Sequence, residues 1–226
     1  MSNKPTVFTD NFFSKISHNS RSQFNGLLGF SELFLLNQKK ITPENTTEYL
    51  LKINMLAKRA FISSENYILF LKIYSDKIVP LKTNSSFLTI LSQSFSLNKE
   101  AFEIKKVTLE NLVKIDFSLN CDSFLTASIL TNIISKSIQL CNDQSKITIS
   151  SKSEDSNRNI SIEFSGMNIE SDIVREFFTH QNKTQDLFAP ELDIELWICY
   201  QLAKLQNIQF QISFDKKNST TFIIKI

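Results

Sequence analysis

FFSKISHNSRSQFNGLLGF, residues 12–30, places one of the chain's two histidines within a helix-like run of apolar and polar residues. Apolar side chains recur on one face at helical spacing, at Phe24, Leu27, Leu28, Phe34 and Leu35. Because an α-helix turns by about 100° per residue, His18 lies roughly opposite this stripe. Its imidazole is therefore expected to point outward, on a face shared with Asn11, Lys15, Ser22, Asn25 and Gly29. Both a solvated surface histidine and a reactive one fit that position.

This stretch belongs to the first of two long helices, expected over residues 7–38 and 43–74. Thr42, Pro43 and Glu44 resemble an N-cap, an N1 proline and an acidic first turn. Small and apolar residues of the second helix follow heptad spacing, at Ile53, Ala57, Ala60, Ser64, Tyr67, Leu71 and Tyr74. A helical hairpin cannot bury both apolar stripes by itself, so pairing with a second copy in a four-helix bundle is expected.

From about residue 77 the pattern becomes a mixture of helices and strands. Helices are expected over residues 85–104, 122–140, 171–178 and 190–205, the second with Cys121 or Asp122 as its N-cap. Strands are expected at 107–110 and 113–119, in a hairpin over 146–164, and at 208–214 and 220–226. The predicted fold class is α+β, with a helical hairpin over residues 1–76 and an α/β sandwich over residues 77–226.

The composition excludes several classes of protein. A chain of 226 residues with 42% hydrophobic residues is globular rather than disordered, and its formal charge of +2 lacks the basic footprint of a nucleic-acid-binding protein. No apolar run reaches the roughly 18 residues of a membrane span, and the first residues lack a signal-peptide core, so a cytoplasmic location is expected. The widely spaced Cys121, Cys141 and Cys199 predict buried free thiols, and no metal site is expected.

A known motif has the same register as the opening stretch. Residues 13–34 resemble the phosphoacceptor helix of the sensor histidine kinases of two-component systems, in which a serine–histidine–acid triplet precedes an arginine, a threonine–proline pair and an asparagine–glycine pair. The matching residues are Ser17, His18, Arg21, Asn25 and Gly26. The later chain is similar in order to the same family, whose helical hairpin precedes an ATP-binding domain of the kinase, gyrase and Hsp90 type (the Bergerat fold). The resemblance implies a phosphoacceptor at His18, with Lys15, Arg21, Ser22 and Asn25 beside it.

Two positions near His18 depart from the family pattern. The acid that follows the histidine is held to be the general base for attack on ATP, but Asn19 stands there and cannot take a proton. The threonine–proline pair is replaced by Ser22 and Gln23. Because Ser22 keeps a hydroxyl, the phosphatase activity that the family's threonine or asparagine serves is a weakened expectation and is not excluded.

The ATP-binding motifs depart further. The family's leading asparagine on the central helix is present as Asn132, but its magnesium-binding asparagine aligns with Lys136, whose ammonium has no lone pair for a metal. The adenine-recognising aspartate aligns with Phe164, which is expected to be a core residue. In the same motif Gly166 is kept, and Asn168 replaces the second glycine.

The last glycine-rich stretch, which wraps the phosphates in the family, aligns with Asp193 and Glu195. Two carboxylates there would repel a polyanion, and they are expected to be solvated acids at a helix start. The segment THQNKTQDLFAP, where the family has a flexible lid, contains no glycine, and His180 within it is assigned no role. The resemblance therefore implies a degenerate ATPase domain with no cofactor-binding residues.

A kept phosphoacceptor beside a dismantled ATP site implies a histidine phosphotransferase, similar to dimeric phosphotransferases with a degenerate ATPase domain. His18 would relay a phosphoryl group between response-regulator aspartates, with Lys15 and Arg21 near the phosphoryl charge. The expected partners are a second copy and receiver domains, with a hybrid histidine kinase as a further candidate; neither nucleic acid nor a membrane is expected. Mg²⁺ is expected only on the receiver. The alternatives are a non-catalytic pseudokinase that acts as an interaction module, and a divergent active histidine kinase or phosphatase.

Overall fold

The computed structural model describes residues 10–37, 42–154, 157–165, 193–215 and 219–226, and it divides into two compact units. The first unit spans Met1–Ser64 and the second spans Glu65–Ile226. The division falls within one long helix, so the last turns of that helix belong to the second unit. The domain boundary predicted between residues 76 and 77 lies just after the end of this helix and stays a prediction.

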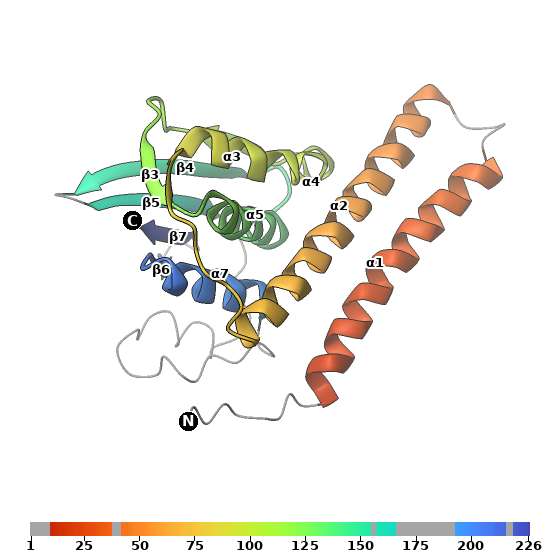
Figure 1. Ribbon diagram of the computed structural model, residues 1–226. Coiled ribbons are helices and arrows are strands. Elements are labelled where there is room, and N and C mark those ends of the chain that lie inside the picture. Colours follow the sequence, from red (N-terminus) through yellow and green to blue (C-terminus); the bar gives the residue numbers. More distant parts are fainter. Residues whose placement is uncertain (1–9, 38–41, 155–156, 166–192, 216–218) are drawn as a thin grey trace. The chain divides into compact units, whose positions relative to one another are not determined.

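The first unit is a helical hairpin, formed by α1 (Asp10–Asn37) and the first part of α2 (Pro43–Tyr74), as Figure 1 shows. Both helices begin and end close to where the sequence predicts. Thr42 is the N-cap expected for α2, because its Oγ1 accepts a hydrogen bond from the backbone N–H of Asn45 at 3.3 Å. Its carbonyl accepts from the N–H of Thr46 at 2.9 Å, the first hydrogen bond of the helix.

Aromatic rings and one glycine bring the two helices of the hairpin together. The ring of Tyr49 on α2 lies 6.3 Å from each of the rings of Phe30 and Phe34 on α1. Near the middle of α1, a Cβ added to Gly26 would lie 3.3 Å from Cδ1 of Leu56. Gly26 therefore leaves room for the side chain of Leu56, because a side chain at this position would press on it.

The apolar stripe of α1 is only partly covered within its own unit. The side chains of Phe24 and Leu28 are 54% and 57% exposed. Apolar area that is left in contact with water forgoes roughly 25 cal/mol per Å² of stabilisation. The hairpin therefore retains an apolar surface that a further helix can cover.

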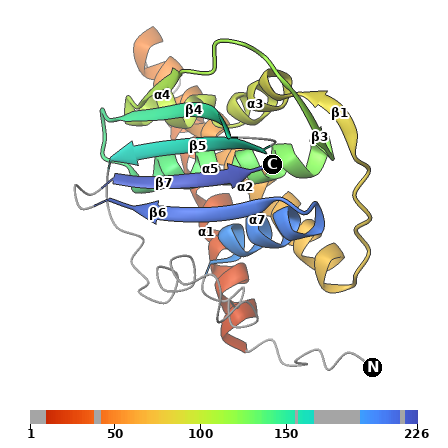
Figure 2. The ribbon, with the colours of Figure 1, turned by 90° about the vertical axis from the view of Figure 1, so that its left-hand side faces the viewer.

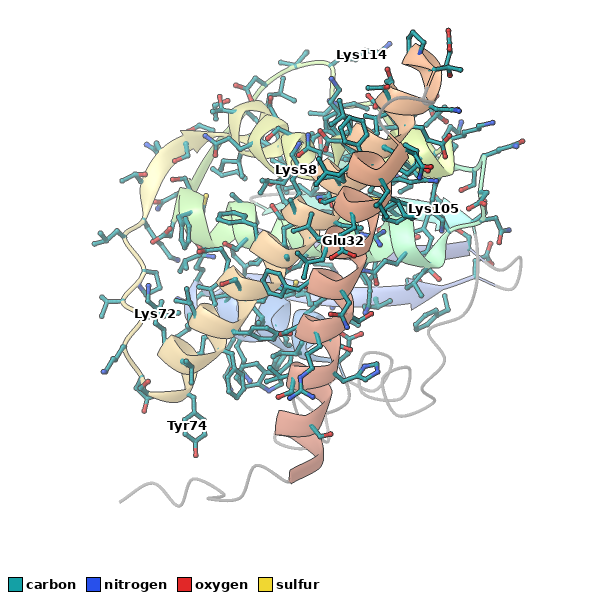
Figure 3. The ribbon with its side chains drawn as sticks, turned by 90° about the vertical axis from the view of Figure 1, so that its right-hand side faces the viewer. Glu32, Lys58, Lys72, Tyr74, Lys105 and Lys114 are labelled. Atoms are coloured by element: carbon teal, nitrogen blue, oxygen red, sulfur yellow. The ribbon has the colours of Figure 1, made fainter. Side chains whose placement is uncertain are left out.

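The end of α2 packs into the second unit. Asn66, Leu69 and Phe70 are buried, and the ring of Phe70 lies 5.3 Å from that of Trp197. Leu71, a position of the predicted heptad seam, is 60% exposed in the single chain. The buried face of these last turns is set by packing within the second unit, and the heptad seam stays a prediction. Lys72 and Tyr74 lie on the final turn (Figure 3).

A five-stranded sheet in the order β2-β4-β5-β7-β6 forms one layer of the second unit. Its strands are β2 (Thr108–Asn111), β4 (Lys146–Glu154), β5 (Asn157–Ser165), β7 (Ser219–Lys225) and β6 (Gln209–Phe214). β2 and β4 pair in parallel, and the other pairs are antiparallel. The predicted hairpin over residues 146–164 and the closing pair of strands are both present.

Helices cover one face of this sheet (Figure 2). α5 (Ser123–Leu140) and α7 (Ile194–Leu205) lie behind the strands, with α3 (Phe87–Ser96) beside α5. Their fully buried side chains include Ile129, Ile133 and Leu202, and the strands contribute the equally buried Ile149 and Ile162 to the core. Helices and sheet together give the α+β class that the sequence predicts.

The segment between α2 and α5 departs from prediction. The helix expected over residues 85–104 is two helices, α3 and α4 (Lys99–Lys105), preceded by the strand β1 (Thr83–Ser86). Ser86 is extended and acts as the N-cap of α3, since its side chain accepts from the N–H of Thr89. The helix breaks at Asn98, whose side chain donates to the carbonyls of Ser94 and Thr131.

The prediction of a strand over residues 113–119 is wrong in position. Instead β3 (Ser118–Cys121) pairs antiparallel with β1 in a separate two-stranded sheet. The Asp116 carboxylate accepts from the Ser86 hydroxyl and from the N–H groups of Leu88 and Phe117, which holds the preceding residues in a loop. The helix expected over residues 171–178 and the first residues of the one expected over 190–205 lie outside the described ranges.

Candidate functional site

His18 lies on the outer face of α1. Its side chain is exposed, and so are those of the neighbouring residues Ser17, Asn19, Arg21, Ser22 and Asn25. Lys15 belongs to the same helix, but its side chain is not among those described. The outward placement expected for His18 is confirmed.

The spacing of residues along α1 places several polar side chains near His18. Ser22 and Asn25 follow His18 by four and seven residues, so they share its face of the helix. Arg21 follows by three, and a guanidinium carries five N–H donors suited to phosphoryl oxygens. An exposed imidazole nitrogen is a nucleophile near neutral pH. This face therefore offers a nucleophile with a cation one turn away.

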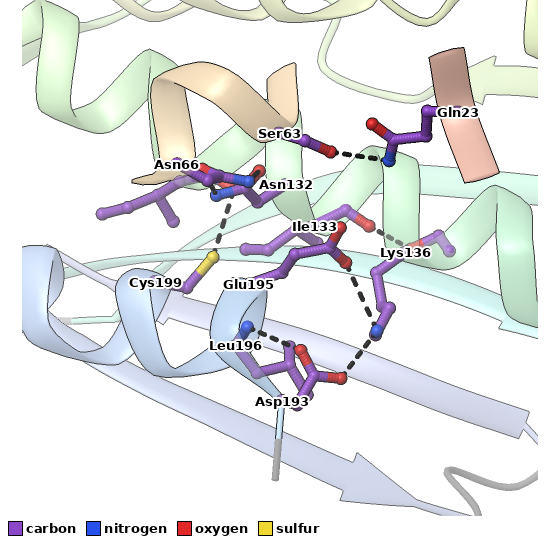
Figure 4. A network of polar contacts seen from close by, with 12 residues as sticks. Gln23, Ser63, Asn66, Asn132, Ile133, Lys136, Asp193, Glu195, Leu196 and Cys199 are labelled. Atoms are coloured by element: carbon purple, nitrogen blue, oxygen red, sulfur yellow. Dashed lines mark hydrogen bonds and ion pairs between the residues drawn. The ribbon is translucent and has the colours of Figure 1, made fainter. Parts of the chain in front are cut away.

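In the second unit, α5 brings Lys136 to the start of α7. Its Nζ lies 2.6 Å from Oδ2 of Asp193 and 3.3 Å from Oε2 of Glu195 (Figure 4). The three side chains are at most 22% exposed. Asp193 is also the N-cap of α7, because its Oδ1 accepts from the N–H of Leu196 at 3.1 Å. The expectation of two solvated acids is wrong, because both carboxylates bind a lysine from another helix.

The charges of this cluster hold one another in the ionised state. Burial by itself lowers the pKa of Lys136, but the attraction of Glu195 and Asp193 and their hydrogen bonds outweigh it. The pKa of the lysine therefore lies well above its ordinary value. Such residues do not fit a magnesium ion with nucleotide phosphates, since a cation already occupies the space between the carboxylates, and carboxylates repel phosphates.

Asn132, four residues before Lys136 on α5, pairs with Asn66 on the end of α2. Each amide nitrogen donates to the other's oxygen, at 2.9 and 2.8 Å. Cys199 on α7 lies beside this pair and is fully buried. Burial, and then the nearby negative charges of Glu195 and Asp193, raise the pKa of the Cys199 thiol well above its ordinary value. The thiol is therefore protonated and unreactive at neutral pH.

Phe164 on β5 is a core residue, as expected. Its side chain is fully buried, and its ring lies 5.8 Å from that of Phe222. A phenyl ring in this position has no acceptor for an adenine amino group. Gly166, Asn168 and His180 lie outside the described residues.

The candidate residues lie in different compact units. The face of His18 belongs to the first unit, and the cluster of Lys136 belongs to the second. Across the described ranges, no three histidine, cysteine, aspartate or glutamate side chains gather closely enough to hold a metal ion. Among the helices that the structure describes, none has the length and apolar character needed to cross a membrane.

The free, buried state expected for Cys121, Cys141 and Cys199 is confirmed.

Sequence reasoning missed Asn66 as the partner of Asn132. A signal was present, because Asn66 interrupts the otherwise apolar face that includes Ile62, Leu69 and Phe70. A polar residue on such a face requires a hydrogen-bonding partner if it is buried. The identity of that partner, 66 residues further along the chain, is not readable from local pattern.

Comparisons with known proteins place this arrangement in context. No protein-family model matches the chain. The sensor protein GacS of Pseudomonas syringae pv. syringae is 25% identical over 173 residues, which cover 74% of this chain and 19% of GacS. The sensor histidine kinase GacS of Pseudomonas protegens is 28% identical over 173 residues, covering 74% of this chain and 18% of that protein. The chain thus spans about a fifth of the length of the curated relatives it matches.

Solved structures show the same fold. The histidine kinase AdeS of Acinetobacter baumannii superposes with a TM-score of 0.59 at 17% identity, over 92% of this chain and 96% of that one. The histidine kinase ThkA, in complex with the response regulator protein TrrA, superposes with a TM-score of 0.56 at 17% identity, over 96% of this chain and 61% of that one. The chain is therefore similar in sequence to sensor histidine kinases over 173 residues, and it shares the fold of solved histidine kinases, a helical hairpin followed by an ATPase-like domain.

Proposed function

We propose that this protein is a histidine phosphotransferase of a two-component phosphorelay, which passes a phosphoryl group between response-regulator aspartates through His18 and binds no ATP itself. The observation that carries the proposal is a contrast between the two units. The aligned phosphoacceptor is exposed, whereas a buried lysine bound to two carboxylates stands at the aligned metal and phosphate positions.

The ATPase-like domain supports the proposal through the charges of Lys136, Asp193 and Glu195. To admit a magnesium–nucleotide complex, the domain would have to separate Lys136 from both carboxylates. Breaking a buried ion pair costs about 3–5 kcal/mol. Phosphates would then meet the two freed carboxylates, which repel them. Phosphate that reaches His18 is therefore inferred to come from another protein.

The transfer itself needs little from this chain. The unprotonated imidazole nitrogen of His18 attacks phosphorus in an aspartyl phosphate of a receiver domain, so that an N–P bond forms and the P–O bond to the aspartate breaks. An aspartate carboxylate of a second receiver then attacks the phosphohistidine, the N–P bond breaks, and the imidazole is restored. Arg21, and Lys15 where it reaches, would bind phosphoryl oxygens, and the receiver supplies Mg²⁺. Ser22 and Asn25 would contact the docked receiver.

Two partners belong to this proposal. Receiver domains are inferred from the proposed chemistry, and the related ThkA is seen in complex with a response regulator. A second copy of the chain is inferred from the half-exposed apolar side chains of α1, including Phe24 and Leu28, which a four-helix bundle would cover. A hybrid histidine kinase is a further candidate, as the source of a phosphorylated receiver.

The proposal is tested by phosphotransfer to the purified chain, with labelled ATP alone and with a pre-phosphorylated receiver domain. The expected result is label from the receiver, none from ATP, and none on the variant His18→Gln. His180→Gln, which makes the same substitution at the chain's other histidine, serves as a matched control that keeps His18. Label that arrives from ATP alone would overturn the proposal in favour of a divergent kinase. No label from a panel of receivers would favour the non-catalytic interaction module.

A further inference from the structure

A polar contact between the two helices of the hairpin lies close to His18 in the sequence. Gln23 follows His18 by five residues, at the position where the family pattern has proline. Proline would remove a backbone donor and kink the helix. Here α1 runs without interruption from Asp10 to Asn37. The side chain of Gln23 reaches α2 instead, and its Nε2 donates to Oγ of Ser63 at 2.8 Å (Figure 4).

This hydrogen bond belongs to an interface that fixes how α1 is rotated. Gln23 and Gly26 are three residues apart on one face of α1, and both meet α2, at Ser63 and Leu56 respectively. Ser63 and Leu56 are seven residues apart, so they also share one face of their helix. Because α1 cannot turn about its axis without breaking both contacts, the face that carries His18 is held away from α2.

We propose that Gln23 is a positioning residue for phosphotransfer, which sets the orientation of His18 through its hydrogen bond to Ser63. The inference rests on the proposed function. A hydrogen bond requires one relative position of donor and acceptor, whereas apolar side chains tolerate slippage between helices. A single polar residue in a helix interface is known to specify register for this reason. The pair therefore replaces a proline kink by a directional contact between the helices.

The test uses the full chain with Gln23→Met and Ser63→Ala, the double variant, and the exchanged pair Gln23→Ser/Ser63→Gln. Methionine keeps the length of glutamine and removes its donor. The rate of phosphotransfer from a phosphorylated receiver is measured at several receiver concentrations, which separates the maximal rate from half-saturation. Gln93→Met, on an exposed position of α3, is the matched control. Far-UV circular dichroism and urea unfolding accompany each variant.

Loss of the hydrogen bond is expected to lower the maximal rate about tenfold, with half-saturation unchanged within about twofold. The double variant should be no slower than either single variant, the exchanged pair should recover part of the rate, and the control should match the wild type. Variants that fold and transfer at the wild-type maximal rate would overturn the positioning role while leaving the proposed function intact. If the wild type itself takes no label from receivers, the proposed function fails, and the positioning role falls with it.

Discussion

Asn66 and Asn132 exchange two hydrogen bonds, at 2.9 and 2.8 Å, although 66 residues separate them in the chain. Their side chains are 3% and 2% exposed, so each amide satisfies the other in a place with little access to water. The pair joins the end of α2 to the central helix α5 within the second unit. Ten residues of a helix that begins in the hairpin are thereby made part of the ATPase-like domain.

Replacing one member of this pair should destabilise the second unit. Asn66→Leu removes both hydrogen bonds that the buried amide of Asn132 makes with Asn66, and a buried polar group that loses its hydrogen bonds costs about 1–3 kcal/mol. The double variant Asn66→Leu/Asn132→Leu should lose less than the sum of the two single variants, because it leaves no amide unpaired. Urea unfolding followed by the fluorescence of Trp197, the chain's one tryptophan, measures both effects in the right unit. Strictly additive losses would show that the pair does not form in solution.

The Lys136 cluster makes a prediction with a pH dependence. Lys136→Met should destabilise the second unit by about 3–5 kcal/mol, because Asp193 and Glu195 are left as uncompensated buried charges. The pKa of Lys136 is raised on folding, so its contribution is fully present below the ordinary lysine value of 10.5 and is lost only at higher pH. The difference between wild type and variant should therefore stay constant from pH 7 to about pH 10.

The matched control for that cluster is Lys146→Met, which removes a surface ion pair with Glu110 at 2.9 Å. It should cost no more than about 1 kcal/mol. If both lysine variants lose the same small amount of stability in urea unfolding, the buried cluster contributes no more to the free energy of unfolding than a surface ion pair does. One argument against ATP binding would then be removed.

Cys199 should make stability fall at alkaline pH. Because its pKa is raised on folding, the unfolded chain ionises first, and stability decreases as the pH rises past the ordinary thiol value of 9.0. Cys199→Ala should remove this part of the pH dependence. Labelling with a thiol reagent at pH 7.5 gives a second measure: Cys199 should react only at the rate of unfolding. Rapid labelling in the native chain would contradict its burial.

Gly26 and Gly29 should respond differently to alanine. Gly29 has no described atom within 4 Å of an added Cβ, so Gly29→Ala should gain the helix propensity of alanine, about 0.5–1 kcal/mol. Gly26→Ala should gain less, because its Cβ would meet Leu56 at 3.3 Å. Urea unfolding of the hairpin helices by circular dichroism tests the order. An equal gain at both sites would mean that a side chain at Gly26 does not press on Leu56.

The inferred second copy of the chain can be tested by changing charge on the α1 stripe. Sedimentation equilibrium should give twice the chain mass of 26.0 kDa for the wild type. Phe24→Asp/Leu28→Asp should sediment as a single chain, since two carboxylates would enter the apolar bundle core. Leu112→Asp, at an exposed site on the second unit, should leave the mass unchanged. A wild type that sediments as one chain would remove the dimer from the proposed function.

Local pattern was sufficient for much of the fold. The start of α2 at Pro43, a capped start of α5 at Cys121 or Asp122 and the antiparallel hairpin of β4 and β5 were all predictable, since capping residues and alternating apolar residues act over a few positions. Of the two capping candidates, the structure uses Asp122. The strand expected over residues 113–119 was not, because Asp116 holds a loop through contacts with Ser86 and Leu88, about 30 residues away.

The sequence by itself determined the two long helices, the antiparallel pair of β4 and β5, the outward face of His18 and the lysine at position 136, because each depends on residue type and short-range spacing. Only the tertiary structure decided which partners meet across the chain. It paired Asn66 with Asn132, brought Asp193 and Glu195 to Lys136, and joined Gln23 to Ser63. The physical reason is that a buried polar group must find a partner, while its own position in the sequence carries no information on where in the fold that partner lies.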